Sequence, residues 1–314
     1  MSIEISVIAP FYNEEENVME FCQRTLAIMN SMQLRFELLL VDDGSKDNTL
    51  LVIEKLAATH ENIRFISFTR NFGHQLALFA GISAAQGQHL ILMDGDLQDP
   101  PELIPKLYHQ LQKGYDVVYA KRNSRSGESA LKKTTANLFY RILNRITRFS
   151  IPVDTGDFRI FNRQVADELM KMQDHSKFLR GQMAWLGFRE SAMSFDREKR
   201  KNGTTGFSYS RMFRFAFDGI TGFSDFPLKF ASYSGIVVSL LSFVLIIYVL
   251  VAKYLLGQTI TGWASLMVTI LFLGGIQLLS IGIIGEYISR INDKVRNRQL
   301  YVVKKTNTTP TSLQ

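Results

Sequence analysis

The chain has little of the chemistry that many nucleotide-binding and metal proteins use. Its 314 residues include one cysteine, Cys22, which excludes an internal disulfide bond and is typical of a reducing compartment. No group of histidines and cysteines has the spacing of a zinc site. The glycine-rich loops of P-loop and dinucleotide-binding proteins are also missing. A phosphate ligand would therefore have to be held in another way, such as through a metal ion.

Charged side chains are missing from two long stretches in the C-terminal third. Residues 230–252 carry no charge, and after Lys253 none occurs from residue 254 to residue 285. About 20 predominantly apolar residues are enough to span a bilayer. A globular helix of this length normally has a charged face, so a buried soluble hairpin is the weaker alternative. We predict transmembrane helices at 230–253 and 262–288.

The net charge of +7 raises the possibility of a nucleic-acid partner. The basic residues, however, gather near the predicted membrane segments, where anionic membrane lipid or phosphate is the simpler partner. Residues 121–148 contain eight Lys or Arg and a single acid, Glu128. A second group contains Arg197, Lys199, Arg200, Lys201 and Arg211. We therefore predict no nucleic-acid partner.

Basic residues also flank both ends of the predicted hairpin. Lys229 precedes the first span, and the second is followed by Arg290, Lys294, Arg296, Arg298, Lys304 and Lys305. By the positive-inside rule, both ends then lie in the cytoplasm. We predict an integral protein of the cytoplasmic membrane with a cytoplasmic domain at 1–206 and a cytoplasmic basic tail at 289–314. The tail is expected to be disordered after Lys305.

The first 120 residues alternate between short β-rich apolar runs and segments of helical periodicity. This alternation predicts an α/β fold with a parallel sheet that is covered by helices on both faces. The predicted strands are 3–10, 36–41, 63–68, 89–93 and 116–120. Beyond residue 122 the pattern predicts a strand at 158–161 and helices at 131–149 and 163–172. Residues 207–229 combine arginines with many aromatics and predict an interfacial amphipathic helix; a helix on the domain core is the alternative.

Acidic residues follow several of these strands. Asp42 and Asp43 end the second predicted strand, Asp94 and Asp96 follow the fourth, and Glu14 lies just after the first. In an open α/β sheet, ligands bind at the carboxyl ends of the strands. Three strand ends with polar groups therefore predict one site at this edge of the sheet.

Such acids suit a ligand that carries a diphosphate. The leaving group of a nucleotide-sugar needs its charge neutralised, and Mg²⁺ or Mn²⁺ can do this while bound to carboxylate and phosphate oxygens. Asp96 and Gln98 are the predicted metal ligands. Asp43 would hydrogen-bond the base or the ribose, and Asp94 the ribose or the sugar.

Six stretches together resemble glycosyltransferase family 2, whose members invert the sugar and have the A-type, Rossmann-like fold. They are VIAPFYNEEENV, LLLVDDGSKDNT, FTRNFGHQLAL, ILMDGDLQDPPE, DTGDFRIFNR and RKNGTTGFSYSR. More narrowly, the chain is similar to bactoprenol glucosyltransferases, relatives of dolichyl-phosphate mannose synthase with a C-terminal two-helix transmembrane hairpin. The resemblance runs from Ile5 to about Arg298.

The resemblance implies a metal-dependent transfer of a hexose, glucose, from a UDP-sugar to undecaprenyl phosphate at the cytoplasmic membrane face. N-acetylglucosamine, mannose or an aminoarabinose derivative are alternative sugars. A membrane adaptor or flippase subunit that only binds nucleotide is an alternative of another class. Similar enzymes form tetramers, so a homotetramer is expected.

The resemblance also assigns roles to single residues. The nucleotide and sugar would be bound by Pro10, Tyr12, Glu14, Asp42, Asp43 and Asp94. Asp96 and Asp157 would be the catalytic acids, with Asp157 near the acceptor as a base or as a positioning residue. A turn aspartate is the alternative for Asp157, and Asp154 is a rival. Arg122 and Arg200 would bind the acceptor phosphate, and His74 would lie either near the donor or at a helix start.

Overall fold

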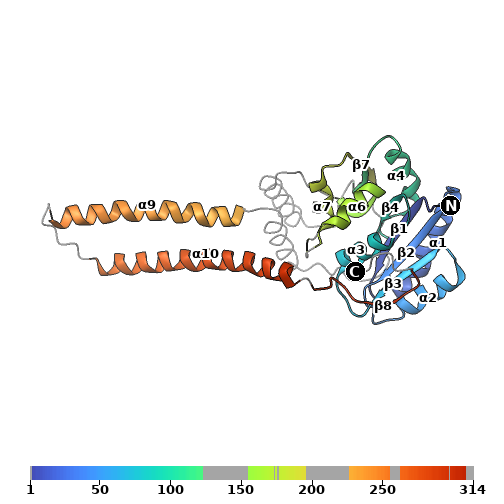
Figure 1. Ribbon diagram of the computed structural model, residues 1–314, viewed down its shortest axis with the longest axis horizontal. Coiled ribbons are helices and arrows are strands. Elements are labelled where there is room, and N and C mark those ends of the chain that lie inside the picture. Colours follow the sequence, from blue (N-terminus) through green and yellow to red (C-terminus); the bar gives the residue numbers. More distant parts are fainter. Residues whose placement is uncertain are drawn as a thin grey trace. The chain divides into compact units, whose positions relative to one another are not determined.

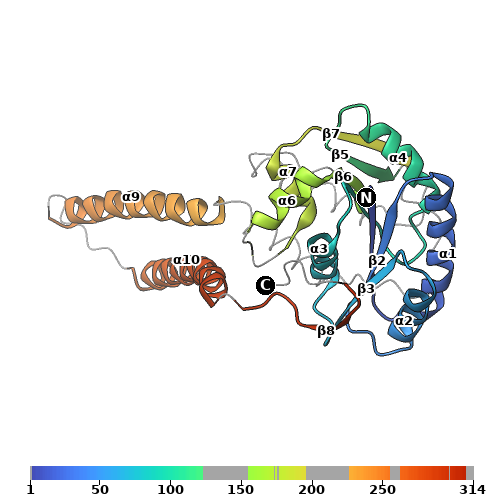
Figure 2. The same cartoon turned by 45° about the vertical axis from the view of Figure 1, so that its right-hand side comes forward.

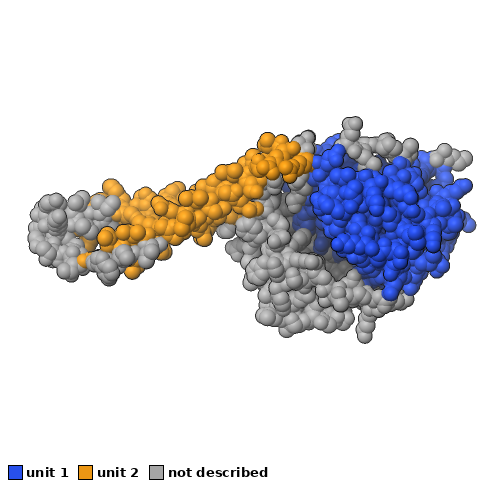
Figure 3. Space-filling view, turned by 90° about the horizontal axis from the view of Figure 1, so that it is seen from below, with its two compact units in different colours: residues 1–144, 148–207, 299–314 blue, residues 145–147, 208–298 orange. Residues whose placement is uncertain are grey.

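The structure is a computed structural model, and it describes residues 2–122, 155–172, 174, 177–195, 226–254, 262–296 and 298–308. The chain divides into two compact units, which Figure 3 distinguishes by colour. The first comprises residues 1–144, 148–207 and 299–314, and the second comprises residues 145–147 and 208–298. The predicted helix at 131–149 and residues 207–225 of the predicted interfacial helix at 207–229 lie outside the described residues.

A single mixed sheet forms the centre of the first unit. The described strands are ordered β7-β5-β6-β4-β1-β2-β3-β8, and Figure 1 labels all of them except β5 and β6, which are labelled in Figure 2. Their bounds are β1 (Ile5–Phe11), β2 (Phe36–Asp42), β3 (Ile63–Phe68), β4 (His89–Leu92), β5 (Val117–Arg122), β6 (Thr155–Asn162), β7 (Glu190–Phe195) and β8 (Val303–Thr306). Strands β1 to β4 pair in parallel. β1 and β2 are buried along their whole length, as central strands of a covered sheet are.

Helices cover both faces of this sheet (Figure 2). Side chains of alternate strand positions enter two separate cores, since Val7 belongs to one and its neighbour Ile8 to the other. Helices α1 and α2 contribute Phe21 and Ile53 to the first core, and α3 contributes Leu78 to the second. The helices are α1 (Glu15–Ser31), α2 (Thr49–Thr59), α3 (His74–Ala84), η1 (Pro101–Leu103), α4 (Ile104–Leu111), α6 (Arg163–Lys171) and α7 (Leu179–Leu186).

The α/β fold is confirmed, and each predicted strand occurs within three residues of its expected bounds. The parallel arrangement predicted from the first 120 residues is confirmed for β1 to β4. Later strands make the sheet mixed, because β6 runs antiparallel to β4 and β5, and β8 antiparallel to β3. Strands β7 and β8 were not predicted. Both lie at the edges of the sheet, where strands are short and polar and give a weak apolar signal.

The tail after the second apolar helix returns to this sheet as β8. Thr306 pairs with Ile66, and the Asn307 side chain accepts a hydrogen bond from the Phe65 amide at 2.7 Å. The Lys305 ammonium lies 2.7 Å from a Glu54 carboxylate oxygen. The expectation of disorder after Lys305 is therefore wrong for residues 306–308, whose polar groups satisfy the open edge of β3.

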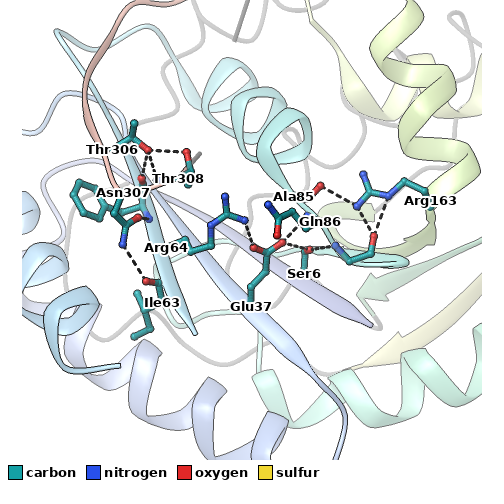
Figure 4. A network of polar contacts seen from close by, with 12 residues as sticks. Ser6, Glu37, Ile63, Arg64, Ala85, Gln86, Arg163, Thr306, Asn307 and Thr308 are labelled. Carbon is teal, nitrogen blue, oxygen red and sulfur yellow. Dashed lines mark hydrogen bonds and ion pairs between the residues drawn. The ribbon is translucent and has the colours of Figure 1, made fainter. Parts of the chain in front are cut away.

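A buried carboxylate ties the amino ends of the central strands together (Figure 4). Glu37 accepts hydrogen bonds from the Ser6 hydroxyl and the Gln86 amide, both at 2.6 Å, and forms an ion pair with Arg64. The Gly87 amide donates to Ser6 at 2.8 Å. This network links β1, β2, β3 and the turn before β4, and it leaves the carboxyl ends of these strands for the site.

The second unit contains two long helices, α9 (Phe226–Tyr254) and α10 (Trp263–Arg296), which contact each other. Both are long and apolar enough to cross a membrane. Their apolar side chains are exposed, as Leu240 at 63% and Leu278 at 72% illustrate. Exposed apolar surface of this extent fits a lipid environment. Helix α10 continues eight residues past the predicted end at 288, so the first part of the predicted tail is helical.

Candidate active site

The predicted acids meet at the carboxyl edge of the parallel strands. Because β6 is antiparallel to β4, its beginning lies at the edge where β4 ends. Leu92 pairs with Arg159, and continuing this register by two residues sets Asp157 opposite Asp94. The sheet thus brings together two acids that are 63 positions apart in the sequence.

Asp157 is buried, and its carboxylate is surrounded by donors. The His74 ring nitrogen Nε2 and the Gln75 side-chain amide each lie 3.0 Å from Asp157 Oδ2. The Arg180 Nε atom lies 3.1 Å from Oδ1. The Gln75 side chain also accepts a hydrogen bond from the Leu179 amide at 3.1 Å, which ties α3 to the start of α7. Asp157 is therefore the meeting point of β6, α3 and α7.

These contacts fix the charges of the group. Burial acts to raise the pKa of Asp157, but Arg180 and the hydrogen bond from His74 outweigh it, so the pKa falls below its ordinary value. Burial acts to lower the pKa of His74, but the Asp157 hydrogen bond and the charge of Asp94 raise it to about 9. At neutral pH the site holds an ionised Asp157 beside an imidazolium.

His74 also approaches Asp94, with Nε2 at 3.4 Å from Oδ1. His74, Asp94 and Asp157 each offer one metal-ligating atom, and these atoms lie within 4.8 Å of one another. A cation bound by all three would need His74 to lose its proton and would be repelled by Arg180. The arrangement suits an ion-pair group better than a metal ion.

Asp43 is held by the loop between β3 and α3. Its carboxylate accepts hydrogen bonds from the Phe72 amide at 2.7 Å and the Gly73 amide at 2.9 Å. Burial raises the pKa of Asp43, and these two amides act in the opposite direction. Gly73 has a φ of 109°, a backbone conformation that favours glycine, and the next residue is His74. The loop therefore connects Asp43 with the Asp157 group.

Asp42 is buried and its two oxygens have partners within the domain. Oδ1 accepts from the Ser45 amide at 3.0 Å, and Oδ2 accepts from the Ser67 hydroxyl at 2.7 Å. These bonds fix the turn after β2 and join it to β3. The geometry favours a supporting role for Asp42.

The acidic turn after β4 contains Asp94, Gly95 and Asp96. Asp96 Oδ1 accepts a hydrogen bond from the Gln98 amide at 3.1 Å, which orients the carboxylate. A side chain at position 95 would lie 2.4 Å from the Phe11 ring, so the turn requires glycine there. Leu97 has a φ of 60°, which closes the turn tightly. Asp96 and Gln98 are both half-buried, and a carboxylate and a side-chain amide oxygen are ligand types that fit Mg²⁺ or Mn²⁺.

The remaining predicted donor-site residues follow β1 at the same edge. Pro10 is buried within β1, and Tyr12 is 40% exposed just after it. Glu14 precedes α1, where its backbone amide donates to the Thr49 hydroxyl at 2.9 Å. These contacts link the turn after β1 to the start of α2.

Comparison with known proteins decides the family of this chain. Residues 6–170 match the family described as Glycosyl transferase family 2. The chain belongs to glycosyltransferase family 2. Residues 226–291 match the GtrB C-terminal hairpin, so the two apolar helices indicate membrane association. The protein is a glycosyltransferase with the A-type fold, as the sequence predicted.

Relatives of this glycosyltransferase match it over nearly their full length. The uncharacterized glycosyltransferase YkcC of Bacillus subtilis is 44% identical, with 96% of this chain and 94% of the relative covered. An uncharacterized glycosyltransferase of Synechocystis is 43% identical, with 96% and 95% covered. The SfII prophage-derived bactoprenol glucosyl transferase of Shigella flexneri is 38% identical, with 97% and 99% covered.

Two solved structures are similar to the chain at low identity. The S. aureus TarS 1-349 complex with UDP-GlcNAc has a TM-score of 0.48 at 18% identity and covers 70% of this chain and 66% of its own. The mannosyltransferase PcManGT of Pyrobaculum calidifontis, in complex with GDP-Man and Mn²⁺, has a TM-score of 0.48 at 17% identity, with 68% and 61% covered.

The glycosyltransferase site contains residues that sequence reasoning missed. Gln75 and Arg180 contact Asp157, yet neither was singled out beforehand. Arg180 lies 23 positions after Asp157 in a short helix without a recognisable motif, so only the fold reveals it. Gln75 stood within the FTRNFGHQLAL stretch and had the better signal. The Arg122 side chain, Asp154 and Arg200 lie outside the described residues, and their roles stay predictions.

Proposed function

We propose that this glycosyltransferase transfers glucose from UDP-glucose to undecaprenyl phosphate at the cytoplasmic face of the membrane. The observation that carries the proposal is the presence, in one chain, of an acid-lined site at a sheet edge and a long apolar hairpin. A soluble acceptor would not require the hairpin. The name of the Shigella flexneri relative, a bactoprenol glucosyl transferase, supports the same acceptor.

The reaction is proposed as a single displacement with inversion. A phosphate oxygen of the lipid attacks the anomeric carbon, and the bond from that carbon to the UDP oxygen breaks with its electron pair leaving on UDP. A phosphate monoester has a second pKa near 6, so the acceptor is largely a dianion at neutral pH. No proton has to be removed from it before the attack.

This chemistry assigns Asp157 to positioning rather than to general-base work. Its carboxylate already accepts hydrogen bonds from His74 and Gln75 and pairs with Arg180, and its pKa is below its ordinary value. Such a group is a poor base. We propose that Asp157 orients His74 and Arg180 toward the reacting phosphates, whose charge both cations would stabilise.

Asp96 and Gln98 are the proposed ligands of Mg²⁺ or Mn²⁺. A cation held by these residues would neutralise charge on the diphosphate leaving group. The Gln98 backbone N–H fixes the orientation of the Asp96 carboxylate, and the turn at Gly95 brings this carboxylate to the edge of the sheet. Asp94 contacts His74 and is proposed to bind the ribose or the sugar.

The nucleotide is proposed to lie across the ends of β1 and β2. Tyr12 is exposed and offers a ring against the base, while Asp43 lies near the base or the ribose. Pro10 and Glu14 shape the turn after β1, and Asp42 supports the turn after β2.

The strand β8 bears on the orientation of the hairpin. β8 follows α10 in the chain and pairs with β3, which precedes α9. If both helices cross the bilayer, the start of α9 and the end of α10 must therefore lie on the same side of it as the sheet. Together with the flanking basic residues, this supports a cytoplasmic domain and tail.

The proposed division is a domain at 1–206, an interfacial region at 207–229, spans at 230–253 and 262–288, and a tail at 289–314. The tail's residues 303–306 are part of the sheet. The homotetramer stays a prediction.

The function is tested by a screen of nucleotide-sugars with the full-length protein in nanodiscs, with and without undecaprenyl phosphate. We expect nucleotide release that depends on both the lipid and Mg²⁺ or Mn²⁺, and UDP-glucose as the best donor. Faster nucleotide release with another nucleotide-sugar would show that the donor is not UDP-glucose, but it would leave the proposed transfer reaction in place. Binding of nucleotide without release in any combination would contradict the proposal and favour the adaptor alternative.

A further inference from the structure

The C-terminal tail of the chain contacts the strand that leads into the donor site. The Tyr301 ring stacks on Phe68, with centroids 4.8 Å apart and an interplanar angle of 22°. The Tyr301 hydroxyl lies 3.3 Å from the Ser83 hydroxyl, and the Thr69 amide donates to the Val302 carbonyl at 3.0 Å. Tyr301 thus joins the end of β3 to α3.

Phe68 in turn contacts the loop that holds Asp43. Its ring packs edge-on against Phe72 at a centroid distance of 5.7 Å. The amides of Phe72 and Gly73 are the donors to the Asp43 carboxylate, and His74 follows directly. A chain of contacts therefore runs from Tyr301 through Phe68 and Phe72 to Asp43, and His74 is the residue that follows this loop.

The loop has little room to adjust independently. A side chain at Gly44, directly after Asp43, would lie 2.2 Å from the Arg70 backbone, so the two loops touch closely there. The Arg70 guanidinium lies 4.0 Å from the Phe72 ring centroid. Movement of residues 69–73 would therefore be passed to Asp43.

We propose that Tyr301 is a positioning residue, which holds loop 69–73 and hence Asp43 and His74 in the conformation that binds the nucleotide-sugar. This inference rests on the proposed function for its choice of ligand. Tyr301 follows the last residue of α10 by only five positions. An intact donor site therefore requires the segment that follows the hairpin in the sequence.

The tail has a second attachment that allows a matched control. Lys305 pairs with Glu54 on α2, and the Asn307 side chain bonds to Phe65. These contacts hold β8 on the sheet but do not touch loop 69–73. Loss of Lys305 should therefore loosen the tail without disturbing Asp43, whereas loss of Tyr301 should disturb both.

The test compares Tyr301→Ala, Tyr301→Phe and Lys305→Ala in the full-length protein in nanodiscs. UDP affinity is measured by calorimetry with Mg²⁺, and hydrogen exchange is followed at the Phe72 and Gly73 amides. An aromatic pair is typically worth about two- to tenfold in an equilibrium constant. We expect Tyr301→Ala to raise the Kd for UDP by about that factor and to accelerate exchange at both amides. Tyr301→Phe, which keeps the stacked ring, should restore both, and Lys305→Ala should change neither.

Tyr301→Leu serves as a second variant should Tyr301→Ala fold poorly, because it keeps apolar volume without the stacked ring. Unchanged exchange at Phe72 and Gly73 in the folded Tyr301 variant would overturn the inference. An equal increase in the Kd for UDP and in amide exchange in Lys305→Ala would overturn it too, because general loosening of the tail would then explain the effects of both substitutions. If the wild-type protein binds no UDP, the proposed function fails, but the exchange comparison still decides whether Tyr301 positions the loop.

Discussion

Asp157 and His74 stabilise each other's charged forms, and this pairing has a measurable pH dependence. The pKa of His74 is raised from 6.5 to about 9, so its contribution to stability is complete below pH 6.5 and is lost as the pH rises through 9. The pKa of Asp157 is lowered from 3.8, so its contribution is present above about pH 3.8 and is lost as the pH falls through the lower folded value. Both contributions are therefore complete between about pH 3.8 and pH 6.5, where the pair stabilises the fold most.

The first prediction follows from that pairing. Asp157→Asn removes the charge that favours the imidazolium, so the pKa of His74 should fall from about 9 toward its ordinary 6.5. NMR titration of the ring in metal-free protein measures this shift. Gln75→Glu is the informative control, since an added carboxylate beside Asp157 should keep the pKa high. A His74 pKa near 6.5 in the wild-type protein would contradict the ion-pair description.

The second prediction concerns Asp96. Asp96→Asn should lower the rate of sugar transfer by about 10²-fold or more, because loss of one large electrostatic contribution typically has this effect. The protein should stay folded and membrane-bound, as circular dichroism and fractionation would report. Glu20→Gln replaces an exposed acid on α1 and should leave the rate unchanged. More than about a tenth of wild-type turnover in Asp96→Asn would show that this carboxylate is not the main metal ligand.

At the scale of elements, the amino ends of β1, β2 and β3 depend on one buried carboxylate. Glu37→Gln leaves Arg64 without its ionic partner and weakens the bonds from Ser6 and Gln86. Breaking a largely buried pair in this way should lower the stability of the domain by about 2–3 kcal/mol. Thermal unfolding in detergent measures the change, and Glu61→Gln at the surface is the matched control.

Because the Glu37 network lies at the edge of the sheet away from the site, UDP affinity of the folded variant should stay the same. A large loss of UDP affinity in Glu37→Gln, at a temperature where the variant is folded, would mean that the two edges are coupled. Unchanged stability of Glu37→Gln would instead mean that water solvates the Arg64 guanidinium in place of the lost carboxylate.

The sequence predicted some elements well and others not at all, for physical reasons. Strands β1 and β2 are buried on both faces and produce continuous apolar runs, and the acids that follow them mark the edge of the site. Strand β8 has the sequence Val-Lys-Lys-Thr, which resembles a solvated tail, and only its pairing with β3 makes it a strand. Arg180 and Tyr301 act through contacts that are remote in sequence and carry no local pattern.

At the scale of the whole chain, the placement of β8 and the flanking basic residues lead to a topology prediction. A cysteine at Thr259, between the two spans, should react with an impermeant maleimide in intact cells, with the outer membrane permeabilised if there is one. A cysteine at Lys304, which is exposed, should react only after lysis. The native Cys22 is buried and its pKa is raised by burial to about 12, so its background should be low. Labelling of the Lys304 position in intact cells would overturn the orientation.

Identification of the lipid product tests the proposed glucosyl transfer most directly. Full-length protein in nanodiscs is incubated with UDP-glucose, undecaprenyl phosphate and Mg²⁺, and the lipid fraction is analysed by mass spectrometry and by NMR of the anomeric proton. We expect a glucosyl phosphate lipid of β configuration, formed from the α-linked donor by inversion, and formation of this product slowed by about 10²-fold or more with Asp96→Asn. A product of α configuration, or UDP release without a glycosylated lipid, would contradict it.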